Sequence, residues 1–158
     1  MTPPVRAHVH SLQRSSGGVP KTTVDEATVD AEGMEGDRQR NRKHHGGPDR
    51  AICIYSLELI EALQAEGHPI TPGSVGENIT IRGLDWLQIT PGVRLAIGPI
   101  TLDITDFAWP CKTIRPSFLD GDSNRISPRL HPGWSRAYAR VTGIGTIRPG
   151  DEVVLVTQ

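Results

Sequence analysis

The chain has 158 residues, of which 36% are hydrophobic and 22% are charged, and its formal net charge is -1. This length is typical of one domain, residues 1–158, with a core large enough to fold without disulfides. The near-zero charge gives no general attraction to nucleic acid or to an anionic membrane, so neither is expected as a partner. The first ten residues lack the apolar core of a signal peptide, and no apolar run could span a bilayer, so we expect a cytoplasmic protein.

Glycine and proline are frequent, with 17 and 13 residues, which indicates many turns between short strands. The two cysteines, Cys53 and Cys111, belong to no CxxC motif and to no repeated Cys/His spacing. A structural disulfide between them is not expected in a reducing cytosol. The cysteines therefore indicate neither a disulfide framework nor a zinc motif.

Two strands are predicted in the first part of the chain. Val5, Ala7 and Val9 alternate with polar residues, which is typical of a half-buried strand. A turn rich in serine and glycine over residues 15–18 ends this strand. Residues 21–29 are rich in threonine and valine, and they predict the second strand.

The most polar stretch covers residues 36–51 and carries four closely spaced cations, namely Arg38, Arg40, Arg42 and Lys43. Such a charge run is most often a solvated face. Here it leads into the Gly46-Gly47 turn, whose free backbone amides could hold phosphate or another oxyanion together with the guanidinium groups, and we favour anion binding. Adjacent histidines on an extended chain point to opposite faces, so no zinc site is expected at His44 and His45.

Residues 51–55, AICIY, predict a short, fully buried strand in which Cys53 packs as a small hydrophobe. Ser56 then caps the clearest helix of the chain, which carries Glu58 in its first turn and ends at Gly67. Its apolar residues recur at helical spacing, at Leu57, Ile60 and Leu63.

A glycine-rich loop over residues 69–78 leads into a predicted strand over residues 79–81. In this loop Gly76 comes directly before Glu77 and Asn78 and could let the backbone approach a ligand closely, although a plain turn is the simpler interpretation. A hairpin is predicted next, with its inward face at Val93, Leu95 and Ile97.

Cys111 is the centre of residues 103–118, DITDFAWPCKTIRPSF. This stretch begins as a strand, and Pro110 removes a backbone donor, so Cys111 is expected where the ladder stops, at the rim of a sheet. Lys112 and Arg115 place positive charge near the thiol, which favours the thiolate that attacks, carries sulfur or binds metal. A free cysteine is usually a small hydrophobe in a core niche, but this context favours a reactive residue.

The sequence beyond residue 118 is polar and irregular until a strand that carries four large residues on one face, Trp134, Arg136, Tyr138 and Arg140. This face could cover a planar, anionic ligand or be an ordinary exposed strand face, and the sequence favours neither. Residues 152–156 predict the last strand. Many short strands and one clear helix predict a mainly β protein, either a barrel or a sandwich.

Four motifs of the chain occur in the order found in one known family. They are GDRQ at residues 36–39, HGGPDRA at 45–51, GEN at 76–78 and the Pro110-Cys111 pair after a strand. With a closing Gly-Asp pair before the last strand, residues 21–156 resemble a MOSC domain, the module at the C-terminus of molybdenum cofactor sulfurases. The resemblance is greatest to stand-alone bacterial members similar to YiiM.

The resemblance implies a closed, Greek-key-like β-barrel with a few short helices. It also implies that Cys111 either binds the molybdenum of the molybdenum cofactor (molybdopterin) or carries sulfur as a persulfide. YiiM-like members use that cofactor to reduce N-hydroxylated compounds, and the family is also associated with pyridoxal phosphate binding. Cofactor-binding residues are then expected at Arg38, His45, Gly46, Gly47, Arg50, Gly76, Glu77, Asn78 and Lys112.

Three functions remain open on the sequence. The first is a molybdenum-dependent reductase of a small-molecule substrate, served by an electron-transfer protein. The second is a sulfur carrier, which needs a separate sulfur donor because the chain contains no aminotransferase-like domain. The third is a structural or anion-binding domain with an inert cysteine. The sequence departs from the YiiM-like pattern in having Phe107-Ala108-Trp109 before Pro110-Cys111, and it lacks the C-terminal extension of those proteins.

Overall fold

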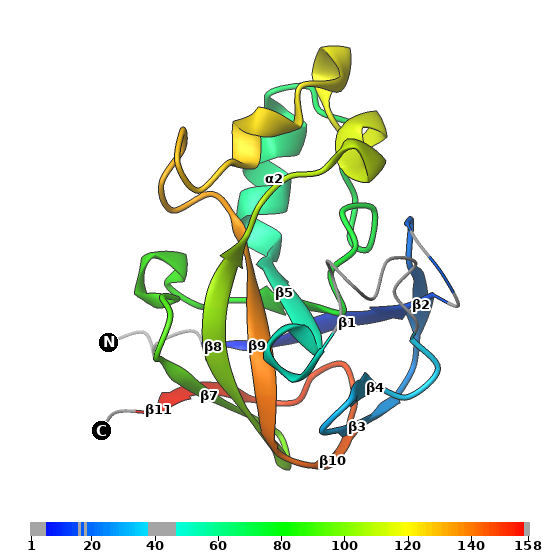
Figure 1. Ribbon diagram of the computed structural model, residues 1–158, viewed down its shortest axis with the longest axis vertical. Coiled ribbons are helices and arrows are strands. Elements are labelled where there is room, and N and C mark those ends of the chain that lie inside the picture. Colours follow the sequence, from blue (N-terminus) through cyan, green and yellow to red (C-terminus); the bar gives the residue numbers. More distant parts are fainter. Residues whose placement is uncertain (1–5, 16, 18, 38–46, 157–158) are drawn as a thin grey trace.

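The computed structural model describes residues 6–15, 17, 19–37 and 47–156, which form two β-sheets and one α-helix (Figure 1). The larger sheet has eight strands in the order β11-β7-β8-β9-β5-β6-β1-β2, and the smaller one has three in the order β10-β3-β4. The strands are β1 (His8–Arg14), β2 (Thr22–Val24), β3 (Ala27–Asp30), β4 (Gly33–Met34), β5 (Ile52–Ser56), β6 (Ile79–Arg82), β7 (Arg94–Ile97), β8 (Ile100–Ala108), β9 (Arg136–Gly143), β10 (Gly145–Ile147) and β11 (Val153–Val156).

The prediction of a mainly β protein is confirmed, but the closed barrel is wrong, because both sheets are open. The physical reason lies in β1, whose pairs at Leu12, Gln13 and Arg14 are taken by β2. Only the start of β1 remains for the segment before β11, where His8 and Glu152 form an isolated antiparallel bridge. The start of β1 and the segment before β11 therefore meet at one isolated bridge and a few neighbouring backbone hydrogen bonds, and no strand ladder of the described residues joins them.

The single strand predicted over residues 21–29 is also wrong, because the structure divides this stretch between the two sheets. Strand β2 pairs with β1, whereas β3 pairs with β10 and β4. Asp25 and Glu26 lie between them, and acidic residues are poor strand formers. The chain therefore leaves the large sheet at these two residues and enters the small one.

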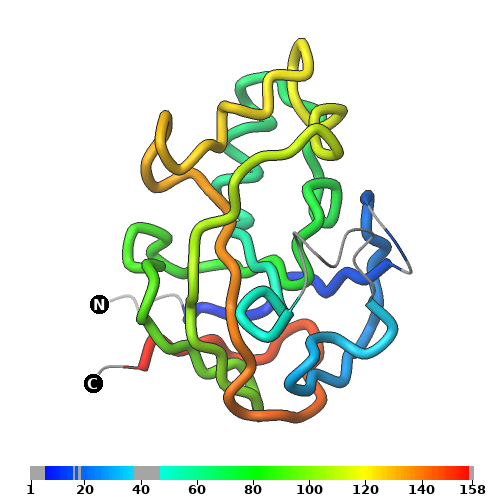
Figure 2. Tube along the Cα trace, in the orientation of Figure 1, coloured from blue at the N-terminus to red at the C-terminus, as the bar shows by residue number. Residues whose placement is uncertain are grey.

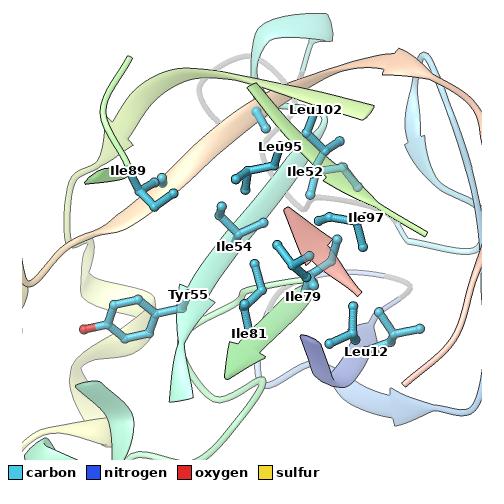
Figure 3. Close-up of a cluster of buried hydrophobic side chains, with 14 of the residues drawn as sticks. Leu12, Ile52, Ile54, Tyr55, Ile79, Ile81, Ile89, Leu95, Ile97 and Leu102 are labelled. Atoms are coloured by element: carbon cyan, nitrogen blue, oxygen red, sulfur yellow. The ribbon is translucent and has the colours of Figure 1, made fainter. Parts of the chain in front are cut away.

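The core lies on one face of the large sheet, where side chains from most of its strands meet (Figure 3). Strand β5 contributes Ile52 and Ile54, and its parallel neighbour β6 contributes Ile79 and Ile81, all with no exposed surface. Each such side chain stabilises the fold by about 1.5–3 kcal/mol relative to leaving it in water. The hairpin of β7 and β8 closes the core with its predicted inward face, including Leu95 and Ile97.

Helix α2 (Leu57–Ala65) follows β5 directly, as the sequence predicts. The Ser56 side chain caps it by accepting a hydrogen bond from the Leu59 amide at 3.2 Å. Gly67 ends it with a φ of 100°, a left-handed conformation that glycine adopts without strain. Leu57, Ile60 and Leu63 are buried, which confirms the predicted apolar face. No helix in the described ranges has the length and apolarity to cross a membrane.

The irregular stretch after β8 folds into three short 3₁₀ helices, η3 (Lys112–Ser117), η4 (Leu119–Gly121) and η5 (Ser123–Ile126), near the end of α2 away from the sheet (Figure 2). The Arg125 guanidinium holds this stretch to the helix through two hydrogen bonds to Glu66, at 2.9 and 2.8 Å. The Leu119 amide adds a hydrogen bond of 3.0 Å to His68 Nδ1. Arg125 also lies over the Trp134 ring, 4.0 Å from its centroid.

Candidate functional site

Cys111 lies three residues beyond the end of β8 and directly before η3. It is therefore outside the strand ladder, as predicted, and its side chain is partly buried against the core. Its Sγ lies 2.8 Å from the Thr113 Oγ1, so the two groups share a hydrogen bond. Residues 109–111, called the Cys111 loop below, also carry Trp109, whose surface is 55% exposed. The thiol is thus reachable from solvent and is still held by a local contact.

Lys112 and Arg115 follow Cys111 on η3, and both side chains are exposed. The cation that is fixed beside the Cys111 loop comes instead from β9, which pairs with β8 so that Arg136 lies opposite Ala108. Arg136 is only 5% exposed. Of the two alternatives left open for the arginine and aromatic face, an ordinary exposed strand face does not fit Arg136 or Tyr138, because both are buried.

The Arg136 guanidinium joins two separate loops. Its Nη1 donates a hydrogen bond of 2.8 Å to the Val75 carbonyl, in residues 73–76, which we call the Val75 loop. Its Nη2 donates a hydrogen bond of 3.1 Å to the Trp109 carbonyl in the Cys111 loop. Its Nε is buried without a hydrogen-bond partner among the described residues. A buried guanidinium held mainly by backbone carbonyls is costly unless its charge is compensated nearby.

The ionisable groups around Arg136 act on its pKa. Burial acts against the charged form, but Cys53, Tyr138, Cys111 and Glu77 together outweigh burial and leave the pKa of Arg136 raised. The same guanidinium is therefore close enough to interact electrostatically with both thiols of the chain.

The GEN motif lies in the interior. Glu77 has no exposed surface, and its carboxylate accepts hydrogen bonds from the Gly73 amide at 3.0 Å and from the Thr80 hydroxyl at 3.2 Å. Burial raises the pKa of Glu77 to about 7, and these hydrogen bonds and Arg136 only partly oppose that shift. Gly76 has a φ of 83°, which lets the chain turn at this point.

Asn78 completes the motif by connecting three parts of the fold. Its Oδ1 accepts a hydrogen bond of 3.0 Å from the Cys53 amide of β5. Its Nδ2 donates to Asp37 Oδ2 at 3.0 Å and to the Gln13 carbonyl at 3.3 Å. The side chain of Asn78 is thus fully used inside the protein.

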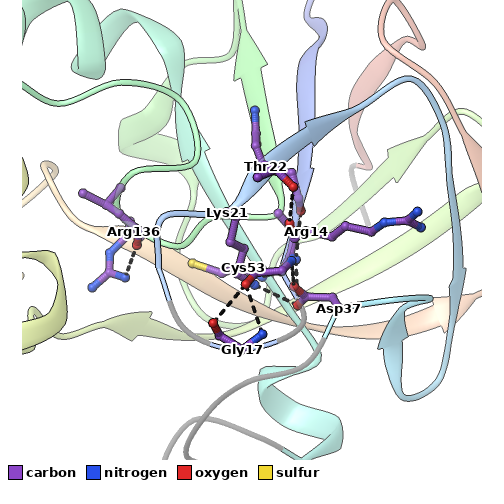
Figure 4. Close-up of polar contacts among 11 residues, drawn as sticks. Arg14, Gly17, Lys21, Thr22, Asp37, Cys53 and Arg136 are labelled. Atoms are coloured by element: carbon purple, nitrogen blue, oxygen red, sulfur yellow. Dashed lines mark hydrogen bonds and ion pairs between the residues drawn. The ribbon is translucent and has the colours of Figure 1, made fainter.

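Asp37 in turn forms a buried ion pair with Lys21 (Figure 4). The Lys21 Nζ lies 2.7 Å from Asp37 Oδ2, and both side chains are 5% exposed. The Ser15 amide donates a further hydrogen bond of 2.9 Å to Asp37 Oδ1. Neither Lys21 nor Asp37 was predicted as a site residue, although Asp37 lies within the GDRQ motif.

Cys53 is 3% exposed, which confirms that it is buried. Because alternate side chains of a strand point to opposite faces, Cys53 does not join the main core with Ile52 and Ile54. It packs with Ala108 and Tyr138 in a small separate cluster, on the side of the sheet where Arg136 lies (Figure 4). Burial raises the pKa of the Cys53 thiol to about 11, with Arg136 acting in the opposite direction.

The HGGPDRA motif is described from Gly47 onward. Gly47 precedes the short 3₁₀ helix η1 (Pro48–Arg50) with a φ of 96°, and the Arg50 guanidinium lies 5.3 Å from the centroid of the Tyr138 ring. Arg50 therefore lies near the cluster that contains Cys53. The expected site residues Arg38, His45 and Gly46, together with His44, lie outside the described residues. Within the described ranges, no group of three or more His, Cys, Asp or Glu residues is placed to hold a metal ion.

The sequence motifs predict the two loops of the site, but they do not predict the residues that join these loops. The sequence pattern places Arg136 only on a strand face, because its burial depends on Val75 and Trp109, which are 61 and 27 residues away in the chain. One signal is present in the sequence, since Arg136 and Tyr138 are flanked by the small residues Ser135, Ala137 and Ala139. No local signal pairs Lys21 with Asp37.

The open β-sheets, the partly exposed thiol just beyond a strand and the buried arginine beside it define a mainly β protein with a cysteine-centred site. The family model described as MOSC domain matches residues 41–154. The chain therefore belongs to the MOSC domain family, and the resemblance seen in its motifs is confirmed.

Two curated relatives show the same relationship. The chain is 27% identical to YflK of Bacillus subtilis over 128 residues, which cover 80% of this chain and 57% of YflK. It is 27% identical to YiiM of Escherichia coli over 125 residues, which cover 73% of this chain and 55% of YiiM. The chain thus spans somewhat more than half the length of these relatives. The solved structure of YiiM from Geobacillus stearothermophilus matches with a TM-score of 0.70 and 25% identity, over 96% of this chain and 75% of that one.

Proposed function

We propose that the protein binds the molybdenum cofactor through Cys111 and reduces small N-hydroxylated compounds. The observation that carries this proposal is the placement of Cys111, which is outside the ladder, partly exposed, and on a loop held by a buried arginine. The association of the MOSC domain family with this cofactor supports the choice of ligand.

The residues present fit such a ligand. A thiolate is a suitable metal ligand, and the Thr113 hydroxyl next to Sγ can donate a hydrogen bond to it. Arg50 and Lys112, with the backbone at Gly47, would hold the phosphate of the cofactor by charge-assisted hydrogen bonds. Glu77 and Asn78 would support the loops from inside, since their hydrogen bonds are made within the protein.

The bound cofactor would supply two-electron transfer, which is chemistry that amino-acid side chains do not provide. Reduction of an N-hydroxyl group to N–H consumes two electrons and two protons and releases water. The electrons would come from an electron-transfer protein. The protein's own contribution would be to hold the thiol just beyond β8 and to supply positive charge from Arg136, Arg50 and Lys112.

Metal analysis tests the proposal directly. Protein made in a host that synthesises molybdopterin should contain molybdenum near one atom per chain, and Cys111→Ser should lose it. Cys53→Ser is the matched control and should keep it. Reduction of a hydroxylaminopurine by the loaded protein, with a chemical electron donor, would then test the substrate class.

Each other outcome has a definite meaning. Protein without molybdenum but with a persulfide on Cys111, detected by intact-mass analysis, would favour a sulfur carrier that receives its sulfur from a separate donor. Protein with neither group on Cys111 would contradict both functions. Molybdenum that persists in Cys111→Ser would contradict the assigned ligand.

A further inference from the structure

Two loops that are distant in the sequence meet at one guanidinium group. The Val75 loop ends at the GEN motif, and the Cys111 loop follows β8. Arg136 donates one hydrogen bond to a carbonyl in each, through Nη1 to Val75 and through Nη2 to Trp109. Because both acceptors are backbone atoms, the contact fixes the path of the chain and not only the position of a side chain.

The guanidinium group is suited to this task. It is planar and presents several donors in a fixed arrangement, so two carbonyls bound to it are held at a defined separation. Hydrogen bonds from a charged donor are stronger than neutral ones. Arg136 is itself anchored on β9, which pairs with β8 over seven residue pairs, so the position of the guanidinium is set by the sheet.

A second contact joins the same two regions. The Ser117 hydroxyl, at the end of η3, lies 2.9 Å from the Ser74 hydroxyl and 3.3 Å from the Ser74 carbonyl. Ser117 is 6% exposed, so this contact is shielded from water. The segment from Trp109 to Ser117, which contains Cys111, is therefore tied to the Val75 loop near both of its ends.

We propose that Arg136 is a positioning residue that holds the Cys111 loop against the Val75 loop, so that the two loops move as one unit. The inference rests on the proposed function only in taking Cys111 as the reacting residue. It assigns Arg136 no contact with substrate or cofactor. Besides its charge, Arg136 acts on the thiol through the Trp109 carbonyl and so through the position of the loop.

The test uses the protein without cofactor and compares Arg136→Lys with the wild type. Lysine keeps the positive charge, but its compact ammonium group cannot reproduce the fixed fork that binds both carbonyls. We expect backbone amide exchange to rise about tenfold over residues 73–78 and 111–118 together, as for the loss of a charge-assisted hydrogen bond. Alkylation of Cys111 should accelerate to a similar extent, while Cys53 stays unlabelled.

Arg94→Lys is the matched control, since it changes an arginine of the same sheet that pairs with Asp103 at the protein surface. It should leave exchange in both loops unchanged. Unchanged exchange in Arg136→Lys, or a rise in only one of the two loops, would overturn the proposal. Labelling of Cys53 in step with Cys111 would also overturn it, because this result would indicate general unfolding and a merely structural role.

Ser117→Ala keeps the proposal testable even where Arg136→Lys does not fold. This small change removes only the second contact, and we expect exchange in both loops to rise together by roughly threefold, as for a neutral hydrogen bond. A rise confined to residues 111–118 would show that the loops move independently. None of these measurements depends on molybdenum, so a failure of the proposed function would leave their outcome unchanged.

Discussion

Cys111 and Cys53 differ in exposure and in the chemistry available to them, although both interact electrostatically with Arg136. Cys53 is 3% exposed and packs against Ala108 and Tyr138. Its raised pKa, about 11 against an ordinary 9.0, makes it about 100-fold less ionised at neutral pH than an ordinary thiol. Cys111 is the last residue of the Cys111 loop and is partly exposed.

Iodoacetamide at neutral pH should therefore label Cys111 roughly 100-fold faster than Cys53, as measured by peptide mass spectrometry over time. Cys53→Ser should not change the rate at Cys111 and should lower the free energy of unfolding by about 1 kcal/mol, as for a small core substitution. Faster labelling of Cys53 would contradict the assignment of Cys111 as the reactive residue.

Glu77 predicts a pH dependence of stability. The folded protein holds the Glu77 proton more tightly, with a pKa of about 7, than the unfolded chain, in which this carboxyl titrates near 4.5. Between these values the folded state binds more protons, so the free energy of unfolding falls as the pH rises from about 4.5 to 7. The largest loss expected from this group is about 3 kcal/mol.

Urea unfolding of the wild type and of Glu77→Gln, at intervals from pH 4.5 to 8, checks this expectation. The wild type should lose stability across this range relative to the variant, because glutamine does not titrate. Parallel curves for the two proteins would show that Glu77 is already ionised well below pH 7 in the folded state.

At the scale of elements, the 3₁₀ stretch after Cys111 depends on its attachment to α2. Arg125, acting mainly through its hydrogen bonds, lowers the pKa of Glu66 to about 2. A carboxyl with a lowered pKa stabilises the fold above its ordinary pKa of 4.5, and this contribution is lost as the pH falls toward 2. The Glu66 side chain is 42% exposed, so solvent screening keeps the contribution small.

Glu66→Gln should lower the free energy of unfolding at pH 7 by roughly 0.2–1 kcal/mol, the usual range for an exposed pair. The difference from the wild type should shrink as the pH falls below 4.5, because the wild-type carboxyl then becomes neutral as well. Glu61→Gln is the control on the same helix, where the contact to Arg82 is longer, at 3.4 Å. An equal effect of both variants would show that Arg125 does not hold the 3₁₀ stretch to the helix.

At the scale of the whole molecule, Lys21 and Asp37 join regions that no shared strand ladder connects. Lys21 precedes β2 in the large sheet, and Asp37 follows β4 in the small one. Asn78 extends the contact to β6 and, through the Cys53 amide, to β5. This buried network therefore links both sheets to the GEN motif.

Asp37→Ala should lower the free energy of unfolding by roughly 3–5 kcal/mol, because it leaves the Lys21 charge buried without its partner. Asp103→Ala removes one partner of an exposed pair with Arg94 and should cost about 1 kcal/mol or less. Chemical denaturation of both variants makes the comparison. Similar losses in the two variants would mean that the buried pair is far more hydrated than its 5% exposure indicates.

The elements that were predicted correctly depend on local patterns. The run AICIY followed by Ser56 predicts a buried strand and a capped helix, and neither requires knowledge of distant residues. Closure of a barrel depends on whether the free edge of β1 can pair with β11, and β2 occupies part of that edge through pairs eight to twelve residues apart, such as Arg14 with Thr22 and Leu12 with Val24. In the site, the position of Cys111 followed from Pro110 alone. The burial of Arg136 did not, because it depends on the register between β8 and β9 and on a carbonyl in the Val75 loop.

The exposed indole of Trp109 is an intrinsic fluorescence probe in the Cys111 loop. Trp109 is 55% exposed and lies two residues before Cys111 in the chain. Of the other two tryptophans, Trp86 is 8% exposed and donates its indole N–H to the Ser135 carbonyl, and Trp134 lies under Arg125. A molecule that binds to the Cys111 loop therefore removes water mainly from the Trp109 indole. The emission of Trp109 then shifts to shorter wavelength. Fluorescence can follow such binding without any added label, and Trp109→Phe provides the silent reference.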